Sequence, residues 1–228
     1  MNKKPPSFTQ GSSHGHLLGR KALLGWIREF LQKSNLDGSF WEFGVFQGES
    51  IKEAYYILRD QLHYYIGFDS FKGLPSLTGV DQLAQKYMPN FTPGNFKSTS
   101  LRFVRENILS TGLSEDQLFL FPGLFSKSLK QEKFKGFLAD MKKHPVVVHL
   151  DSDLYTSTKQ ALEFVYPLLR TGCWILCDDY WCFGGASSYG TQLALKEFLM
   201  DHPDIRLQEY GNYNGWSKAF IVERLNGE

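Results

Sequence analysis

The stretch Ser39–Ser50, S-F-W-E-F-G-V-F-Q-G-E-S, decides the fold of this 228-residue chain. It opens with a short apolar run typical of a buried strand, and a glycine turn at Gly44 then leads into a helical pattern over 51–62. A second apolar run, Tyr64–Phe68, ends directly at Asp69. Strand, glycine turn, helix and strand in this order predict the βαβ unit of a parallel sheet.

The same alternation continues toward the C-terminal end of the chain. Helical patterns follow over 98–111, 156–169 and 189–201, and strand-like runs over 117–121, 145–150 and 173–177. Two last runs, over 205–210 and 217–223, flank Asn214-Gly215, a dipeptide that favours a tight hairpin turn. We predict an α/β, Rossmann-like fold: a mostly parallel seven-stranded sheet, helices on both faces and an antiparallel C-terminal hairpin.

Two further segments complete what we expect to be a single domain over 1–228, a length that suits one α/β domain. Apolar residues at helical spacing over 17–33 predict that residues 1–35 form an N-terminal helical extension. Glycines and prolines interrupt residues 70–97, and loops this long are usually functional or disordered. We interpret this segment as a lid over a site, with a surface insertion as the alternative.

Composition excludes several classes of partner. The 25 Lys and Arg residues balance 24 Asp and Glu residues, so no basic surplus is available for nucleic acid. No apolar run reaches the roughly 18 residues of a membrane span, and residues 1–20 lack the apolar core of a secretory signal. Cys173, Cys177 and Cys182 form no CxxC pair and read as buried thiols, so we expect a cytoplasmic protein. The N-terminal helix could serve either as a lid or as the contact of a homo-oligomer.

Acidic residues collect where the predicted strands end. Asp69, Asp151 and the pair Asp178-Asp179 each follow directly on a strand, and Glu42 lies near the end of another. A single carboxylate at such a position can simply cap the next helix. In open parallel sheets, however, ligands bind outside the carboxyl ends of the strands, so five acids at one edge indicate a binding site.

The turn after the first strand reads E-x-G-x-x-x-G-x-S, with Glu42, Gly44, Gly48 and Ser50 at its defined positions. Its glycines allow close approach of the backbone to a ligand and tight entry into the next helix. The central glycine of the G-x-G-x-x-G dinucleotide motif is missing, so a nucleoside without a pyrophosphate suits the turn better. Asp69, at the end of the second strand, is placed to accept hydrogen bonds from ribose hydroxyls.

Four motifs together carry a resemblance to a known family. They are E-F-G-V-F-Q-G-E-S at 42–50, G-F-D-S-F-K-G-L-P at 67–75, H-L-D-S-D-L-Y at 149–155 and D-D-Y at 178–180. In order and spacing the chain resembles the macrocin O-methyltransferase (TylF) family over residues 36–223. These are class I methyltransferases that use S-adenosyl-L-methionine and a divalent metal, usually Mg²⁺, to methylate sugar hydroxyls. The resemblance implies both cofactors and a small-molecule or glycan acceptor with vicinal hydroxyls.

The resemblance also implies roles for single residues. The methionine end of the cofactor would be held by Glu42, Gly44, Gly48 and Ser50, and its ribose by Asp69 with Ser70 beside it. The metal ligands would be Asp151, Asp178 and Asp179, and the general base Asp153. The segment after Pro75 and the stretch after Tyr180 depart from the family pattern, and these are the parts that face the acceptor.

Three alternatives stay open at this point. His149 precedes Asp151 by two residues and shares its face of the strand, so it is a rival base, or else a hydrogen-bonded core histidine. The D-S-D tripeptide also resembles the D-x-D metal motif of metal-dependent glycosyltransferases, which require a sugar-nucleotide site. A non-catalytic methyltransferase-like binding protein is the third reading, although such a protein has no need of four clustered aspartates.

Overall fold

The computed structural model describes residues 15–98 and 100–225, and for residues 15–18 it describes the backbone alone. The first part of the predicted N-terminal extension, residues 1–14, lies outside the described residues. Within the described ranges, no helix is both long and apolar enough to cross a membrane.

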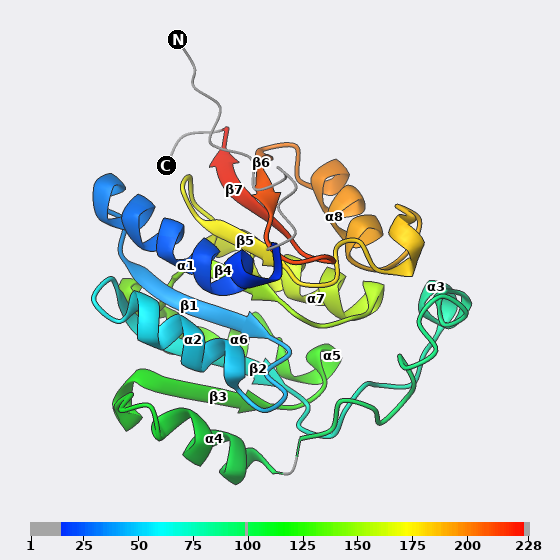
Figure 1. The fold of residues 1–228 in the computed structure, drawn as a ribbon, viewed down its shortest axis with the longest axis horizontal. Coiled ribbons are helices and arrows are strands. Elements are labelled where there is room, and N and C mark those ends of the chain that lie inside the picture. The colour runs from blue at the N-terminus through cyan, green and yellow to red at the C-terminus, as the bar shows by residue number, and fades with distance from the viewer. Residues whose placement is uncertain (1–14, 99, 226–228) are drawn as a thin grey trace.

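All seven predicted strands are present. They are β1 (Gly38–Phe43), β2 (Leu62–Asp69), β3 (Leu118–Pro122), β4 (Pro145–Leu150), β5 (Trp174–Cys177), β6 (Ile205–Asn212) and β7 (Lys218–Arg224). They form one sheet in the order β3-β2-β1-β4-β5-β7-β6, in which the first five strands run parallel (Figure 1). β7 is antiparallel to both β5 and β6, so the C-terminal hairpin is confirmed.

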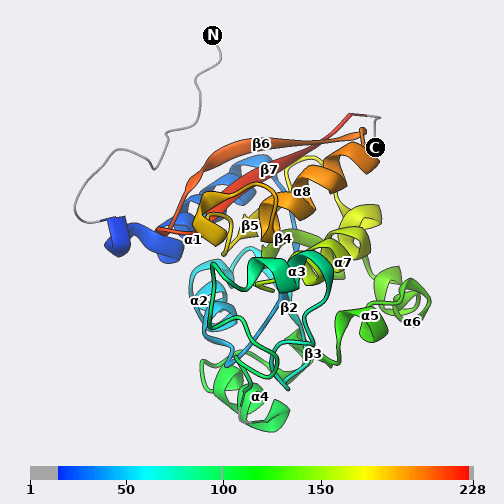
Figure 2. The same ribbon diagram turned by 90° about the vertical axis from the view of Figure 1, so that its right-hand side faces the viewer.

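Helices cover both faces of this sheet. The longer ones are α1 (Gly15–Ser34), α2 (Glu49–Leu58), α4 (Leu101–Leu109), α7 (Tyr155–Val165) and α8 (Gly190–Asp201). Figure 2 shows α1 and α2 on one side of the sheet and α7 and α8 on the other. Because both faces are covered, every residue of β1 and β4 is buried, which explains their nearly continuous apolar sequences.

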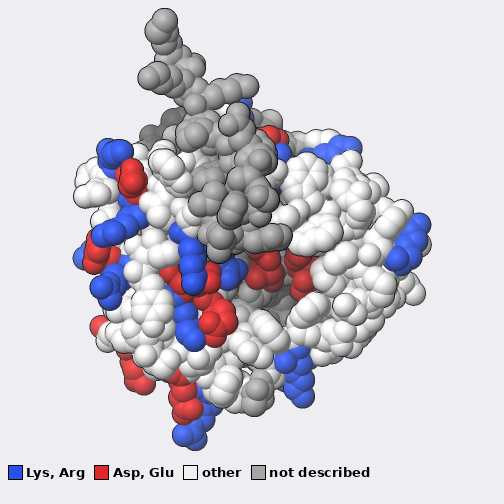
Figure 3. All heavy atoms as spheres, viewed as in Figure 1, with Lys and Arg blue, Asp and Glu red and all other residues white. Residues whose placement is uncertain are grey.

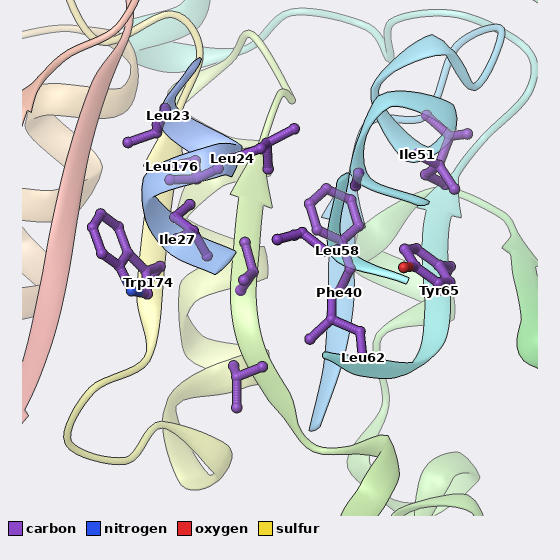
Figure 4. Close-up of a cluster of buried hydrophobic side chains, with 14 of the residues drawn as sticks. Leu23, Leu24, Ile27, Phe40, Ile51, Leu58, Leu62, Tyr65, Trp174 and Leu176 are labelled. Atoms are coloured by element: carbon purple, nitrogen blue, oxygen red, sulfur yellow. The ribbon is translucent and has the colours of Figure 1, made fainter. Parts of the chain in front are cut away.

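The core consists of two main clusters, one on each face of the sheet. Figure 4 shows part of the first, in which Leu24 and Ile27 of α1 and Ile51 of α2 lie over Phe40 and Trp174. The second cluster joins Trp41 and Phe43 of β1 to the buried faces of α7 and α8. Consecutive residues of β1 thus face opposite clusters, as the pleat of a strand requires.

Some local expectations were wrong. Helix α2 ends at Leu58 rather than at residue 62, because β2 already begins at Leu62. The chain between β3 and β4 also contains short helices and 3₁₀ turns that periodicity does not reveal. These are α5 (Phe125–Ser128), α6 (Gln131–Phe134) and turns at Phe137–Ala139 and Met141–Lys143. Each spans about one helical turn or less, too little for a 3.6-residue repeat to show.

The segment 70–97 leaves the end of β2, carries the short helix α3 (Gly79–Ala84) and returns before α4 (Figure 1). Its Ala84 and Phe91 pack in a third, smaller cluster with Leu154, Cys182 and Phe183. Those last three residues follow β4 and β5. The segment therefore packs against the chain directly beyond the two strands that lead into the acidic motifs.

Candidate active site

A pocket of about 500 Å³ lies at the carboxyl ends of the parallel strands, and Figure 3 shows acidic side chains gathered in a hollow of this face. The predicted site residues that line it are Gly44, Asp69, Ser70, Asp151, Asp153, Asp178 and Asp179. The segment 70–97 supplies further lining, including Leu74, Asp81, Phe91 and Phe96. Glu42, Gly48, Ser50 and His149 are not among the lining residues.

The first glycine of the turn is required by a close contact within the protein. Gly44 has a φ of +97°, and a Cβ at this position would overlap the carbonyl oxygen of Asp151. From the sequence we expect Gly44 to allow a ligand to come close. In the structure its nearest neighbour is the loop after β4. Gly48, with a φ of +87°, precedes α2, and a Cβ there would lie 2.5 Å from Ile108 of α4.

Asp69 holds two loops together through its carboxylate. One oxygen, Oδ2, accepts hydrogen bonds from the backbone N–H groups of Val45 and Phe46, both at 2.8 Å. The other, Oδ1, accepts from the N–H of Phe71 at 2.6 Å. Phe46 and Phe71 have φ angles of 49° and 52°, a region that costs a bulky residue of order 1–3 kcal/mol. Three of the roughly four acceptor positions of this carboxylate are therefore used inside the protein.

Ser70 forms a local turn next to Asp69. Its hydroxyl donates to the carbonyl of Gly73 at 2.8 Å and accepts from the N–H of Lys72 at 3.0 Å. The position beside the expected ribose is thus part of a rigid turn at the start of the segment 70–97.

Glu42 and His149 form a buried pair on the adjacent strands β1 and β4. Both side chains are inaccessible to solvent, and Glu42 Oε1 contacts His149 Nδ1 at 2.7 Å and also accepts from the hydroxyl of Ser50. His149 Nε2 lies 3.9 Å from Asp178 Oδ1, an ion-pair distance rather than a hydrogen bond. Burial alone would lower the pKa of His149, but Asp178 and Glu42 raise it to about 10. The imidazole is therefore a buried cation between two carboxylates.

The aspartates after β4 and β5 lie side by side. Leu150 and Cys177 are paired in register, and the N–H of Asp178 donates to the carbonyl of Leu150 at 3.0 Å. Asp151 and Asp178 thus occupy equivalent positions on neighbouring strands. Asp153 adopts a φ of 62°, within a tight turn where the N–H of Leu154 bonds the carbonyl of Ser152 at 2.6 Å.

Mutual repulsion shapes the electrostatics of this group. Burial, followed by the charge of Asp178, raises the pKa of Asp151 well above its ordinary value. Burial and Asp179 do the same to the pKa of Asp153, and burial and Asp178 raise the pKa of Asp179 to about 6. Burial opposes ionisation of Asp178, but His149, Arg20 and Ser217 together lower its pKa. Several carboxylates crowded together with too few donors are characteristic of a cation site.

The residues present fit a divalent cation. Hard cations prefer oxygen ligands, and Asp179 Oδ2 is buried without a hydrogen-bond partner among the described residues. Among the described residues, the group whose ligand atoms all lie within 4.8 Å of one another is Glu42, His149 and Asp151. Asp151, Asp178 and Asp179 line one pocket but do not form such a group. Without a cation, Asp178 and Glu42 favour the charged form of His149 against the effect of burial, and only a neutral imidazole can bind a metal. Asp151, Asp178 and Asp179, the set that the family resemblance implies, offer carboxylate oxygens alone, the ligands that Mg²⁺ prefers.

The sequence did not reveal several supporting side chains. Ser217, in the turn before β7, donates to Asp178 Oδ1 at 3.1 Å, and the thiol of Cys182 donates to Asp179 Oδ1 at 3.2 Å. Asp81 of α3 reaches the start of α7 from the segment 70–97. A turn serine or a buried cysteine carries no sequence signal of this kind. All three cysteines are buried, as expected.

This strand order, the glycine turn and the acid at the end of β2 define the class I methyltransferase fold, with its pocket where the strand order reverses. The chain belongs to the macrocin O-methyltransferase (TylF) family, whose profile matches residues 18–202. The solved structure of the O-methyltransferase NovP is similar in fold, with a TM-score of 0.67 and 20% identity over 90% of this chain and 80% of that one.

Two relatives from streptomycetes are similar in sequence. The 8-demethyl-8-(2,3-dimethoxy-alpha-L-rhamnosyl)-tetracenomycin-C 4'-O-methyltransferase of Streptomyces olivaceus is 31% identical over 72% of this chain. The demethyldecarbamoylnovobiocin O-methyltransferase of Streptomyces niveus is 26% identical over 64% of it. The matched parts span 62% and 54% of these proteins, so the chain covers less than two thirds of either.

Proposed function

We propose that this protein is an S-adenosylmethionine-dependent, Mg²⁺-dependent O-methyltransferase that methylates a hydroxyl on the sugar of a glycosylated natural product. The observation that carries the proposal is the group of four aspartates after β4 and β5, in one pocket with the glycine turn and Asp69. Family membership supports the reaction, and both relatives are O-methyltransferases of natural products.

The residues divide into a donor side and a metal side. Asp69 would bind the ribose with its remaining acceptor position, whereas Glu42, which is fully buried and does not line the pocket, would support the turn through Ser50. Asp151, Asp178 and Asp179 would hold the cation. When bound, S-adenosylmethionine supplies a methyl group on a good leaving group, and Mg²⁺ supplies positive charge that favours ionisation of a nearby hydroxyl.

Asp153 is the residue we assign as general base. It lines the pocket beside Asp151 and Asp179, so it can reach a hydroxyl held near the proposed cation. His149 is fully buried, does not line the pocket and contacts Glu42 through Nδ1, so it is not placed to take a proton from an acceptor. We assign it instead to positioning Glu42 and Asp178.

A binding experiment separates this proposal from a glycosyltransferase. Isothermal titration calorimetry with S-adenosylhomocysteine should show binding, whereas UDP with Mg²⁺ should show none. Transfer of a labelled methyl group is then measured on a panel of aryl glycosides, with and without EDTA. Binding of UDP alone would refute the proposal, and full activity after rigorous chelation would refute its metal part.

A further inference from the structure

The segment 70–97 is fastened at its base and again near its tip. At the base, the N–H of Leu74 donates to Asn95 and the N–H of Gly94 donates to Leu74, both at 2.9 Å. Near the tip, the carboxylate of Asp81 accepts hydrogen bonds from the N–H groups of Tyr155 at 2.8 Å and Thr156 at 3.1 Å. Asp81 is only 4% exposed. The second fastening joins α3 to the beginning of α7 (Figures 1 and 2).

Helix α7 depends on this distant side chain for its cap. The first N–H groups of a helix have no partner within the helix and are usually satisfied by a serine, threonine, aspartate or asparagine at the position before it. In α7 that position is Leu154, whose side chain cannot accept a hydrogen bond. Asp81 supplies the acceptor and also places a negative charge at the positive end of the helix dipole.

The capped end of α7 lies directly beside Asp153. Tyr155 follows Asp153 by two residues, and the turn between them holds Asp153 in the left-handed region. Leu154, inside this turn, packs in one cluster with Ala84 and Phe91 of the segment 70–97. The segment thus fixes the turn of Asp153 by two hydrogen bonds that the Asp81 carboxylate accepts and by apolar packing.

We propose that Asp81 is a positioning residue that latches the segment 70–97 over the pocket and holds Asp153 in place. The latch itself is independent of the reaction, while the effect on Asp153 rests on the proposed function. The two parts require separate measurements.

The latch is tested with Asp81→Asn, which keeps the size of the side chain and loses its charge. Gln82→Ala, at an exposed position of the same helix, is the matched control. In Asp81→Asn, amide exchange over 154–158 should be about five- to tenfold faster, the effect of losing a helix cap. Tryptic cleavage after the exposed Lys86 should accelerate similarly. Unchanged exchange and cleavage would overturn the latch. Asp81→Glu, which retains the charge, should be intermediate and serves if Asp81→Asn does not fold.

The positioning role is tested by a double-mutant cycle. Asp81→Asn should lower kcat about tenfold and change the affinity for S-adenosylhomocysteine by less than about threefold. The double variant should have a kcat only slightly lower than that of Asp153→Asn alone, because both substitutions act through Asp153. Additive losses would overturn positioning through Asp153. Absence of methyl transfer by the unaltered protein would refute the proposed function, and the exchange data would still decide the latch.

Discussion

The two halves of the pocket differ in how the protein satisfies their carboxylates. At the ends of β1 and β2, Asp69 accepts three backbone hydrogen bonds and stabilises two left-handed residues, Phe46 and Phe71. At the ends of β4 and β5, burial and then the neighbouring carboxylates raise the pKa values of Asp151, Asp153 and Asp179, while that of Asp178 is lowered. The protein itself satisfies the Asp69 carboxylate of the first half, whereas Asp179 Oδ2 of the second has no hydrogen-bond partner among the described residues, and we propose a cation there.

One buried histidine connects the two halves. His149 pairs in register with Glu42 on β1, and its other nitrogen faces Asp178 after β5. A positive charge at this position compensates one carboxylate on each side. This one charge does not offset all the carboxylates of the second half, since Asp151, Asp153 and Asp179 still have raised pKa values. The substitutions that best probe the comparison therefore remove one acid from each half.

The largest effect is expected from Asp151→Asn. Turnover should fall roughly a thousandfold or more, because a metal ion contributes several kcal/mol to stabilising the transition state. The metal-free protein should lose no stability and gain about 1 kcal/mol, since a buried, repelled carboxylate is removed. Methyl-transfer kinetics and denaturant unfolding in EDTA measure the two. A marked loss of stability without metal would contradict the conclusion that the carboxylates after β4 and β5 destabilise the metal-free protein.

Asp153→Asn should have the next largest effect. Removal of a general base typically costs 10²–10⁴-fold, so we expect turnover to drop by about a hundredfold or more. Calorimetric binding of S-adenosylhomocysteine should be unchanged, because Asp153 is not assigned to the donor side. A kcat near that of the unaltered protein would remove Asp153 from the mechanism.

The sequence predicts the sheet and the position of the acidic residues at its edge. Each acid follows directly on a strand, so strand pattern alone placed Asp151, Asp178 and Asp179 at one sheet edge, and the structure lines one pocket with them. The sheet, with its antiparallel hairpin, follows from alternating periodicity and from Asn214-Gly215. These features depend on local pattern and on the general rules of parallel sheets.

Long-range contacts account for what the sequence could not give. The sequence predicts that Gly44 approaches a ligand, and the structure shows that the loop after β4 also packs against it. Asp69 lines the pocket and also accepts a hydrogen bond from the backbone of the turn after β1. Asp81 caps a helix that begins 74 residues further along the chain. Such partners are fixed by tertiary packing, and no spacing in one sequence encodes them.

Asp69→Ala tests the half of the pocket at the ends of β1 and β2. Three backbone donors would lose a charged acceptor, and we expect a loss of about 3 kcal/mol in the free energy of unfolding, at about 1 kcal/mol for each bond. The exposed Asp60, paired with Arg28 at 2.7 Å, provides the control. Asp60→Ala should cost less than about 1 kcal/mol, as exposed ion pairs do. Equal losses in the two variants would show that Asp69 does not hold the turn.

The smallest effect is a pH dependence of stability that belongs to the half of the pocket at the ends of β4 and β5. Burial and the charge of Asp178 raise the pKa of Asp179 from 3.8 to about 6, so the folded protein binds this proton more tightly than the unfolded chain. The resulting stabilisation is present below about pH 4 and is lost as the pH rises through 6. We expect a loss of about 1 to 2 kcal/mol, because the neighbouring acids share the titration.

Comparison with Asp179→Asn isolates this contribution from the other groups that titrate. The difference in unfolding free energy between the unaltered protein and the variant, measured in EDTA, should change over this pH range and be flat above about pH 7. Millimolar Mg²⁺ should oppose the loss in the unaltered protein, because a bound cation replaces the proton as the partner of the carboxylate. If the difference were independent of pH, Asp179 would titrate normally, and its carboxylate would not destabilise the metal-free protein.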